Sequence, residues 1–513
     1  MLDGRTLWEL IERRAAESPD AEMAVDEDGR RLTFGGYRDA CERAAAGLAD
    51  LGVGPDDVVS WQLPTWIESL VLVGALARLG ATQNPILPIY RKREVGFVAR
   101  QAGTKLLVVP TTWKGFDFGG MAEEIAAEVD GLAVLRCDRS LPEGDPATLP
   151  TPPATPDDPD DLPVRWLFYT SGTTADPKGA RHTDATIAAI ARGMGQRYEV
   201  APSDRGAMVF PFTHIGGITW LLTGLMFGSA SILVEAFDPA TTIGVLAAEG
   251  VTLAGAGTPF HMAYLAAQRA HPDTPLFPDV RAFPGGGAPK PKGLHDDVKR
   301  EVGGVGILSG YGLTEAPILT LVAVDDPDDK KADTEGRPMP GVDLRIVTLD
   351  GRVAGPGEEG EIRAKAPQLM KGYLDASLDA DAFDEDGYFR SGDLGVQDAD
   401  GYVTITGRLK DIIIRKGENI SAKEVEDLLF THPEVADVAV IGLPDPASGE
   451  RACAVVVLND AGGGLTQDEV REYLVGEGLM IQKVPEQLEV VDALPRNPTG
   501  KVLKHQLKET FGA

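Results

Sequence analysis

The chain has 513 residues, a length that suits about three domains of roughly 150 residues and excludes a single small binding module. Hydrophobic residues make up 43% and charged residues 25%, which excludes the collagenous, disordered and disulfide-rich classes. Because 49 Lys and Arg stand against 79 Asp and Glu, the net charge is −30, which argues against a general nucleic-acid or anionic-membrane surface. Any phosphate must therefore bind in a local site.

The N-terminal residues 1–20 mix acids with arginines, lack the apolar core of an export signal, and predict an amphipathic first helix. Three widely separated cysteines, Cys41, Cys137 and Cys453, support neither a disulfide framework nor a zinc knuckle. The longest apolar stretch, 220–234, is interrupted by Gly, Ser and Thr and is too short to span a bilayer. We therefore expect a cytoplasmic protein without a transmembrane segment.

From residue 36 to about 110 the chain alternates helix-period segments with short apolar runs. The pattern predicts a helix that carries Ala44, Leu48 and Leu51, strands at 58–63 and 106–109, and a helix at 67–79. Helices that alternate with strands imply a parallel sheet covered on both faces. Eight prolines and seven acids then mark 138–163 as a solvated connection.

The second half of the chain is richer in strand patterns. A strand at 164–169 runs into a loop of glycines and threonines, and alternation at 342–348 predicts another strand. After residue 409 the hydrophobic pattern changes and predicts a helix at 424–429 and a strand at 438–441. This change predicts a separate small α+β domain.

Three early segments have the composition of a nucleotide site. YTSGTTADPKG, residues 169–179, offers backbone amides, hydroxyls and one lysine that could surround a polyphosphate, although it lacks the spacing of the Walker loop. GGGAPK, residues 285–290, and SGYGLTEAP, residues 309–317, add an aromatic ring, Tyr311, and a carboxylate, Glu315, suited to Mg²⁺. Taken singly, the first segment favours phosphate binding over a flexible turn, whereas the other two are weak, because glycine-rich turns are common in α/β proteins and Tyr311 could be an ordinary packed tyrosine.

Three later segments complete the set: GYFRSGDLG at 387–395, GRLKDIIIRKGENISAKEVE at 407–426 and PRNPTGKVLK at 495–504. In this order, the six segments resemble the superfamily of adenylate-forming enzymes, which includes acyl-CoA synthetases, adenylation domains of peptide synthetases and luciferases. The resemblance implies an α/β fold. A large N-terminal domain, 1–409, would hold two doubly wound α/β subdomains and a β-barrel, and a small mobile α+β domain, 410–513, would close over the active site.

The resemblance also implies residue roles. The ATP-binding set would be Thr170, Ser171, Gly172, Thr173, Thr174, Lys178, Gly287, Ala288, Pro289, Tyr311, Gly312, Thr314, Asp393 and Arg408. The acyl and thiol pockets would be lined by His214, Ile215, Gly216, Gly217, Gly285, Gly286 and Pro317. Lys416 and Gly417 would face CoA, and Lys410 would be the hinge. The catalytic groups would be Lys501, Glu315, Thr314 and Lys178, with Glu315 also holding Mg²⁺.

One position departs from the family. Ala175 stands where the phosphate loop usually has glycine or serine. If the loop needs a positive φ there, alanine costs about 1 kcal/mol. This substitution concerns the movement of the loop rather than its identity.

The implied activity is ATP- and Mg²⁺-dependent activation of a carboxylic acid as an acyl-adenylate, followed by transfer to CoA with release of AMP and pyrophosphate. Two basic stretches, 408–423 and 496–508, would attract the phosphates of CoA or an acidic carrier protein alike. The absence of an attached carrier region favours CoA. Loading of a carrier protein and a luciferase-like oxygenase remain alternatives, whereas a non-catalytic paralogue would have lost Lys501 or Glu315.

The acyl group is less defined. Residues 88–95 and 108–117 resemble the branch that acts on short- and medium-chain acids and on cyclohexanecarboxylate. No cationic or amide side chain is evident for a substrate amino group, which disfavours an amino acid. His214 could be either a gate between the acyl and thiol pockets or a packing residue. A homodimer is one possible oligomeric state.

Overall fold

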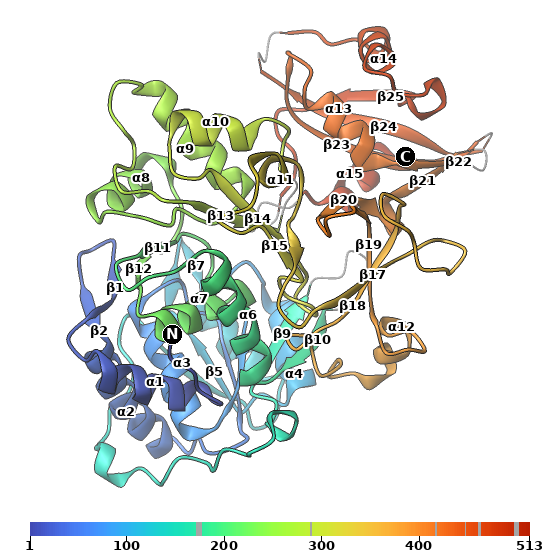
Figure 1. Cartoon of the computed structure of the whole chain (residues 1–513). Coiled ribbons are helices and arrows are strands. Elements are labelled where there is room, and N and C mark those ends of the chain that lie inside the picture. Colours follow the sequence, from blue (N-terminus) through green and yellow to red (C-terminus); the bar gives the residue numbers. More distant parts are fainter. Residues whose placement is uncertain are drawn as a thin grey trace.

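The structure is a computed structural model that describes residues 1–170, 177–287, 290–415, 418–446, 448–459, 463–496 and 502–512. The predicted loop residues Ser171, Gly172, Thr173 and Thr174, with Ala175, lie outside these ranges, as do Ala288, Pro289, Lys416, Gly417 and Lys501. Figure 1 shows the large N-terminal region in blue to yellow and the C-terminal region in orange and red.

The first sheet has six strands in the order β10-β9-β4-β3-β5-β8. Its strands are β3 (Val58–Trp61), β4 (Thr82–Pro85), β5 (Leu106–Val109), β8 (Ala133–Arg136), β9 (Trp166–Thr170) and β10 (Lys178–His182). All neighbouring strands are parallel except β10 and β9, which are antiparallel. The predicted strand at 106–109 is confirmed to the residue, and those at 58–63 and 164–169 are confirmed with shifts of one or two residues at their ends.

The second sheet is assembled from two four-stranded parts. The strands are β1 (Glu22–Asp26), β2 (Arg31–Thr33), β11 (Arg205–Met208), β12 (Ala230–Leu233), β13 (Phe283–Gly286), β14 (Ile307–Tyr311), β15 (Thr320–Leu321) and β16 (Arg337–Pro338). Their orders are β11-β12-β1-β2 and β13-β14-β15-β16. Leu253 joins the two parts because it bridges in parallel to Gly206 on one side and to Ala282 on the other.

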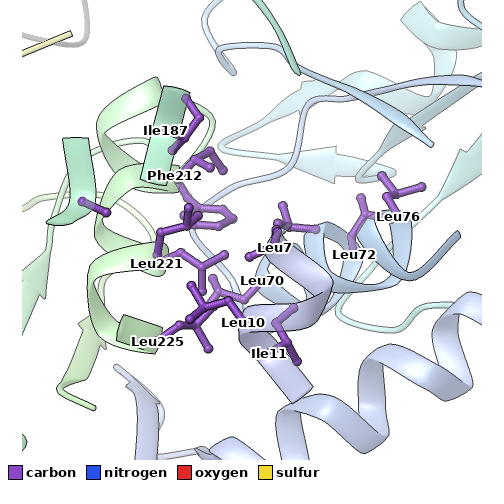
Figure 2. Close-up of a cluster of buried hydrophobic side chains, with 14 of the residues drawn as sticks. Leu7, Leu10, Ile11, Leu70, Leu72, Leu76, Ile187, Phe212, Leu221 and Leu225 are labelled. Atoms are coloured by element: carbon purple, nitrogen blue, oxygen red, sulfur yellow. The ribbon is translucent and has the colours of Figure 1, made fainter. Parts of the chain in front are cut away.

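Helices fill the space between the two sheets and cover their outer faces. The central layer holds α1 (Leu7–Glu17), α2 (Phe34–Asp50), α3 (Ile67–Leu79), α6 (Asp184–Arg197) and α7 (Ile215–Phe227). Its apolar core includes Trp61 and Trp166 from the first sheet and Leu233 and Leu308 from the second. Figure 2 shows the leucines of α1, α3 and α7 packed in this layer. Each such buried side chain contributes about 2 kcal/mol relative to an exposed one.

The outer helices complete five layers. On the first sheet, α4 (Lys92–Ala102) and α5 (Phe118–Ala126) pack against Leu107 and Val109, whereas Val108 points into the central layer. On the second sheet, α8 (Pro239–Ala248), α9 (Thr258–Ala270) and α10 (Leu294–Glu301) pack against residues such as Phe283 and Ile307. The strands therefore have apolar neighbours on both faces, as their unbroken apolar runs predicted.

Smaller elements surround these layers. The strands β6 (Thr112–Trp113) and β7 (Phe116–Asp117) form a hairpin. The connection predicted at 138–163 is mostly exposed and contains two 3-10 turns, Pro146–Thr148 and Pro159–Asp161. Short helices α11 (Asp328–Asp333) and α12 (Asp379–Ala382) follow later in the chain.

The β-barrel that the resemblance implies takes the form of a four-stranded antiparallel sheet within the described ranges. Its order is β17 (Asp343–Val347), β18 (Gly360–Lys365), β19 (Phe389–Gln397) and β20 (Val403–Arg408). A 3-10 turn, Leu409–Asp411, then leads out of this sheet. The domain boundary that we propose, between 409 and 410, falls within this single turn.

The C-terminal region is a five-stranded sheet between helices. Its elements are β21 (Ile412–Arg415), β22 (Glu418–Ser421), α13 (Ala422–Leu429), β23 (Val435–Asp445), β24 (Gly449–Leu458), α14 (Gln467–Gly476), β25 (Gln487–Val490) and α15 (Lys504–Phe511). Alternate residues of β23 face opposite sides: Val438 and Val440 pack with α13 and α14, and Ala439 and Ile441 pack with α15. The region thus has two small apolar cores of its own.

Across the described ranges, no helix combines the length and apolar character needed to cross a bilayer. All three cysteines are buried and free.

Candidate active site

The candidate residues gather where strands of the two sheets end. Thr170 closes β9 of the first sheet, and Tyr311 closes β14 of the second. The hydroxyl of Thr170 lies 3.5 Å from Oε1 of Glu315, four residues beyond Tyr311. The carboxyl ends of the two sheets therefore face one another, which is where α/β folds place their ligands.

Two predicted nucleotide residues, Tyr311 and Arg408, bind the buried carboxylate of a third, Asp393. Asp393 on β19 is 3% exposed, and its register partner on β20 is Arg408. Oδ1 of Asp393 lies 2.7 Å from Nε of Arg408, and the Tyr311 phenol donates to Oδ2 at 2.9 Å. Burial, followed by the charge of Asp393, raises the pKa of Tyr311 well above its ordinary value. The phenol therefore stays protonated and keeps donating.

Glu315 is held by a tyrosine that the sequence analysis did not single out. The Tyr373 phenol donates to Oε1 of Glu315 at 2.9 Å. Nζ of Lys178 lies 5.5 Å from the centroid of the same ring. The strand of Lys178 and the turn of Glu315 are thus linked through one side chain. Tyr373 follows a glycine in an unremarkable stretch, so only the fold could identify it.

A buried histidine holds the neighbouring residue of that turn. Nε2 of His182, on β10, lies 2.9 Å from the carbonyl oxygen of Thr314, and Nδ1 lies 3.0 Å from the hydroxyl of Thr186. Burial lowers the pKa of His182 to about 4, so the ring is neutral. A carbonyl only accepts, so Nε2 carries the proton and donates to Thr314. His182 follows Lys178 by four residues and so lies on the same face of β10. This spacing is the feature of the sequence that could have pointed to His182.

Three cations converge near this pocket. Lys410, in the turn after β20, has a pKa lowered first by burial and then by Arg408, with a smaller effect of Lys178, whereas Asp411 and Asp393 raise it. Like charges perturb one another in this way only at short range. Lys178, Lys410 and Arg408 therefore lie near one another, together with Asp393 and Asp411, and the cations are of the kind that binds phosphate.

Glycines let backbone segments approach closely beside these groups. A Cβ on Gly286 would lie 2.7 Å from the carbonyl oxygen of Gly310, and one on Gly312 would lie 2.1 Å from the amide nitrogen of Ile318. Gly285 is similarly closed off by the His261 ring, and Gly287 has a φ of +77°. Pro317, in the turn that follows Tyr311, is buried. Side chains at the first two positions would displace backbone.

The predicted acyl-pocket histidine begins helix α7. Nδ1 of His214 accepts from the backbone N–H of Gly216 at 3.1 Å, an N-cap, and its ring meets Phe210 edge-on. Burial lowers the pKa of His214 to about 4. Ile215 is buried, and Gly217 packs against the backbone of Phe212. His214 therefore has a structural role as the neutral N-cap of α7. This role is separate from any contact that it makes with a ligand.

Glu315 is the carboxylate that we assign to Mg²⁺ at this place. Searched over the described ranges, the chain has no group of three or more His, Cys, Asp or Glu that could hold a metal ion. Mg²⁺ commonly binds through one or two carboxylates together with substrate phosphates. Glu315 fits that mode, because it lies beside the cations that would bind the phosphates.

Comparisons with known proteins cover nearly all of the chain. A family model described as AMP-binding enzyme matches residues 11–374, and a model described as AMP-binding enzyme C-terminal domain matches residues 424–501. A medium-chain fatty-acid–CoA ligase of Escherichia coli (strain K12) is 32% identical over 98% of this chain and 90% of its own length. A salicyl-AMP ligase/salicyl-S-ArCP synthetase of Mycobacterium tuberculosis is also 32% identical, over 99% of this chain and 91% of its own.

Among solved structures, o-succinylbenzoate coenzyme A synthetase (MenE) from Bacillus subtilis, in complex with ATP and magnesium ion, superposes with a TM-score of 0.84. The two chains are 26% identical, and the match covers 97% of this chain and 99% of the other.

Proposed function

The chain belongs to the AMP-binding enzyme family as an AMP-forming acid–thiol ligase, and from this premise we propose that it joins a short- or medium-chain fatty acid or an alicyclic acid to CoA. The observation that carries the nucleotide part of the proposal is the buried Tyr311–Asp393–Arg408 network beside Glu315 and Lys178. These groups supply an acceptor for sugar hydroxyls, a ring for a base and charges for phosphates.

In the first half-reaction the ionised carboxylate attacks the α-phosphorus of ATP. A P–O bond to the acid forms, the bond to the β-phosphate bridging oxygen breaks, and pyrophosphate leaves with the electron pair. Two anions must approach each other, so cations that offset their repulsion are the main requirement. We assign this to Lys501 at the carboxylate and α-phosphate and to Lys178 at the β- and γ-phosphates. No general base is needed, because the acid is already ionised.

The geometry supports the remaining nucleotide contacts that we propose. Asp393 would accept hydrogen bonds from the ribose hydroxyls while Arg408 and Tyr311 fix its orientation. Glu315 would hold Mg²⁺, which when bound draws charge from the phosphates. Thr170 and Thr314 would face the same phosphates, and Gly286 and Gly312 let neighbouring backbone pack closely beside them.

In the second half-reaction a thiol attacks the acyl carbonyl and AMP leaves. Lys501 is not needed for this step, so rotation of residues 410–513 about Lys410 would replace it with the face that carries Lys416 and Gly417. The proposed hinge lies in the single turn between β20 and β21.

CoA is the favoured acceptor for a reason visible in the C-terminal region. Four of its described basic residues are paired with acids: Arg415 with Glu486, Lys423 with Asp427 one helical turn away, Arg496 with Asp437 and Lys504 with Glu426. A patch paired in this way offers little net charge to an acidic carrier protein. CoA needs only a few cations at its phosphates. A carrier-protein acceptor is the second candidate, favoured by the salicyl-S-ArCP synthetase relative.

An uncharged acyl tail is supported by the proposed pocket. Among its described members, Ile215, Gly216, Gly217, Gly285, Gly286 and Pro317 carry no charge, and burial keeps His214 neutral. An anionic or cationic tail would meet no partner there and would be costly to desolvate.

The test is pyrophosphate release over a panel of carboxylic acids, with and without CoA, followed by mass spectrometry of the products. We expect AMP, pyrophosphate and an acyl-CoA, with highest kcat/KM for an uncharged short, medium or alicyclic acid. ADP and orthophosphate as products would overturn the mechanism. An adenylate that acylates a carrier protein but not CoA would select the second candidate.

A further inference from the structure

Tyr373 touches two candidate phosphate-binding groups that come from different sheets. Its phenol donates to Oε1 of Glu315 at 2.9 Å, and its ring centroid lies 5.5 Å from Nζ of Lys178. Lys178 stands on β10 of the first sheet, and Glu315 follows β14 of the second. The side chain is only 5% exposed. Tyr373 therefore connects the two halves of the pocket.

The backbone around Tyr373 is fixed on both sides. Toward β10, the N–H of Leu374 donates to the carbonyl of Gly179, the N–H of Lys371 donates to the carbonyl of Arg181, and the N–H of Arg181 donates to the carbonyl of Gly372. Toward the Glu315 turn, the N–H of Met370 donates to the carbonyl of Glu315 at 2.9 Å. The segment Met370–Leu374 is thus a strap that ties the strand of Lys178 to the turn of Glu315.

One carboxylate anchors the strap itself. Oδ1 of Asp379 accepts from the N–H of Tyr373 at 2.8 Å. Gly372 has a φ of +82°, and a Cβ there would lie 2.6 Å from Oδ2 of the same Asp379. The direction in which Tyr373 leaves the backbone is therefore strongly constrained, since another residue at 372 would strain the backbone and displace the anchor.

The hydroxyl of Tyr373 is the donor in its hydrogen bond to Glu315, because an ionised carboxylate only accepts. A neutral donor on one oxygen orients a carboxylate without removing its charge, and hydrogen bonds to ionised groups are the stronger kind. The ring meanwhile offers its negative face to the ammonium group of Lys178.

We propose that Tyr373 is a positioning residue for the magnesium–nucleotide complex: its hydroxyl sets the orientation of Glu315 toward Mg²⁺, and its ring holds Lys178 toward the phosphates. The inference rests on the proposed function, because it assigns these partners to a nucleotide. Tyr373 acts through Glu315 and Lys178 and is not itself a catalytic residue.

The chain contains a matched control. Tyr402 is likewise 5% exposed, donates to a carboxylate, Asp326, at 2.7 Å, and has Nζ of Lys330 5.1 Å from its ring centroid. None of these residues belongs to the proposed nucleotide site. Tyr402→Phe should therefore reproduce the structural cost of losing such a hydroxyl without its effect on the ligand.

The experiment measures ATP binding to the full chain by calorimetry, with Mg²⁺ and with EDTA, for the wild type, Tyr373→Phe and Tyr402→Phe. We expect Tyr373→Phe to raise the Kd for MgATP about tenfold and to leave the Kd in EDTA nearly unchanged. Tyr402→Phe should leave both constants unchanged. The KM for MgATP should rise more than kcat falls in Tyr373→Phe.

A double-mutant cycle tests the route through Glu315. In a Glu315→Gln background, Tyr373→Phe should have little further effect on MgATP binding, because the charge it orients is gone. Equal effects in both backgrounds, or a thermal destabilisation greater than that of Tyr402→Phe with unchanged magnesium dependence, would overturn the proposal. Failure of the wild type to bind MgATP would instead overturn the proposed function.

Discussion

Two ion pairs, one in the N-terminal region and one in the C-terminal region, differ in how far they are buried. In the N-terminal region Asp393 is 3% exposed and bound by both Tyr311 and Arg408. In the C-terminal region the pair of Arg496 and Asp437 keeps side-chain exposures of 35% and 25%. A buried network is set before any ligand arrives, whereas partly solvated pairs can exchange partners at little cost. The comparison indicates a preformed nucleotide site opposite a region able to change its contacts.

The contact between the two regions is consistent with this contrast. Ser421, the N-cap of α13, donates from Oγ to the carbonyl of Thr406 on β20 at 2.8 Å. Glu335, near Lys290 and Lys423, has a pKa raised to about 7, mainly by burial, with the two lysines opposing the rise. Polar contacts of this kind are easier to break and re-form than an apolar core.

The largest expected effect comes from removing the proposed catalytic cation of the C-terminal region. Lys501→Ala should slow adenylation by about 10²–10³-fold, because one stabilising charge is lost from the transition state. Thioester formation from a supplied acyl-adenylate should change far less. Pyrophosphate exchange and acyl transfer, measured separately, check this expectation, and equal losses in the two steps would be evidence against the assignment.

The next effect concerns the turn that joins the regions. Lys410→Pro fixes φ near −65° and removes a backbone donor, so it should hinder rotation of the C-terminal region. We expect pyrophosphate exchange to persist while acyl-CoA formation from the adenylate falls by about tenfold or more. If pyrophosphate exchange and acyl-CoA formation both persist, or if both are lost in a protein that still folds, Lys410 is not the hinge.

A pair of variants sharpens the contrast between buried and exposed charges. Asp393→Ala leaves the Arg408 and Tyr311 groups without their shared acceptor and should lower the free energy of unfolding by about 2–3 kcal/mol. Asp437→Ala breaks the exposed pair with Arg496 and should cost less than about 1 kcal/mol. Chemical denaturation of both variants measures the difference. Equal costs would show that burial does not separate the two regions.

The smallest effect is a pH dependence of stability located in the N-terminal region. Burial lowers the pKa of His182 and His214 to about 4 and that of His261 to about 3. Unfolded imidazoles titrate near 6.5, so between about pH 6.5 and 4 the unfolded chain binds more protons and the free energy of unfolding falls as the pH drops. Each histidine should cost about 1 kcal/mol at pH 5.5.

Denaturation curves at pH 7.5 and 5.5 check this expectation. His182→Gln, which keeps a donor for Thr314, should reduce the difference between the two curves. If the variant loses as much unfolding free energy between pH 7.5 and 5.5 as the wild type does, the acid sensitivity arises elsewhere.

The sequence by itself determined the elements and the family. Helix 67–79 and strand 106–109 agree with the structure to the residue, because their apolar patterns are local. The order of the motif segments was enough to identify the superfamily. The predicted helix around Ala44 ends at Asp50, and Leu51 beyond it is 55% exposed, since end residues depend on packing that periodicity does not record.

Only the tertiary structure decided which side chains meet. Tyr373 reaches Glu315 across 58 residues, and His182 reaches Thr314 across 132. The stretch 496–508 has no acid of its own, yet Arg496 and Lys504 find Asp437 and Glu426 in remote elements. Periodicity and motif spacing describe neighbours along the chain, whereas these contacts depend on how two sheets and their helical layers pack. The groups that orient the site were therefore set by long-range packing, and the groups that define its chemistry were readable in the sequence.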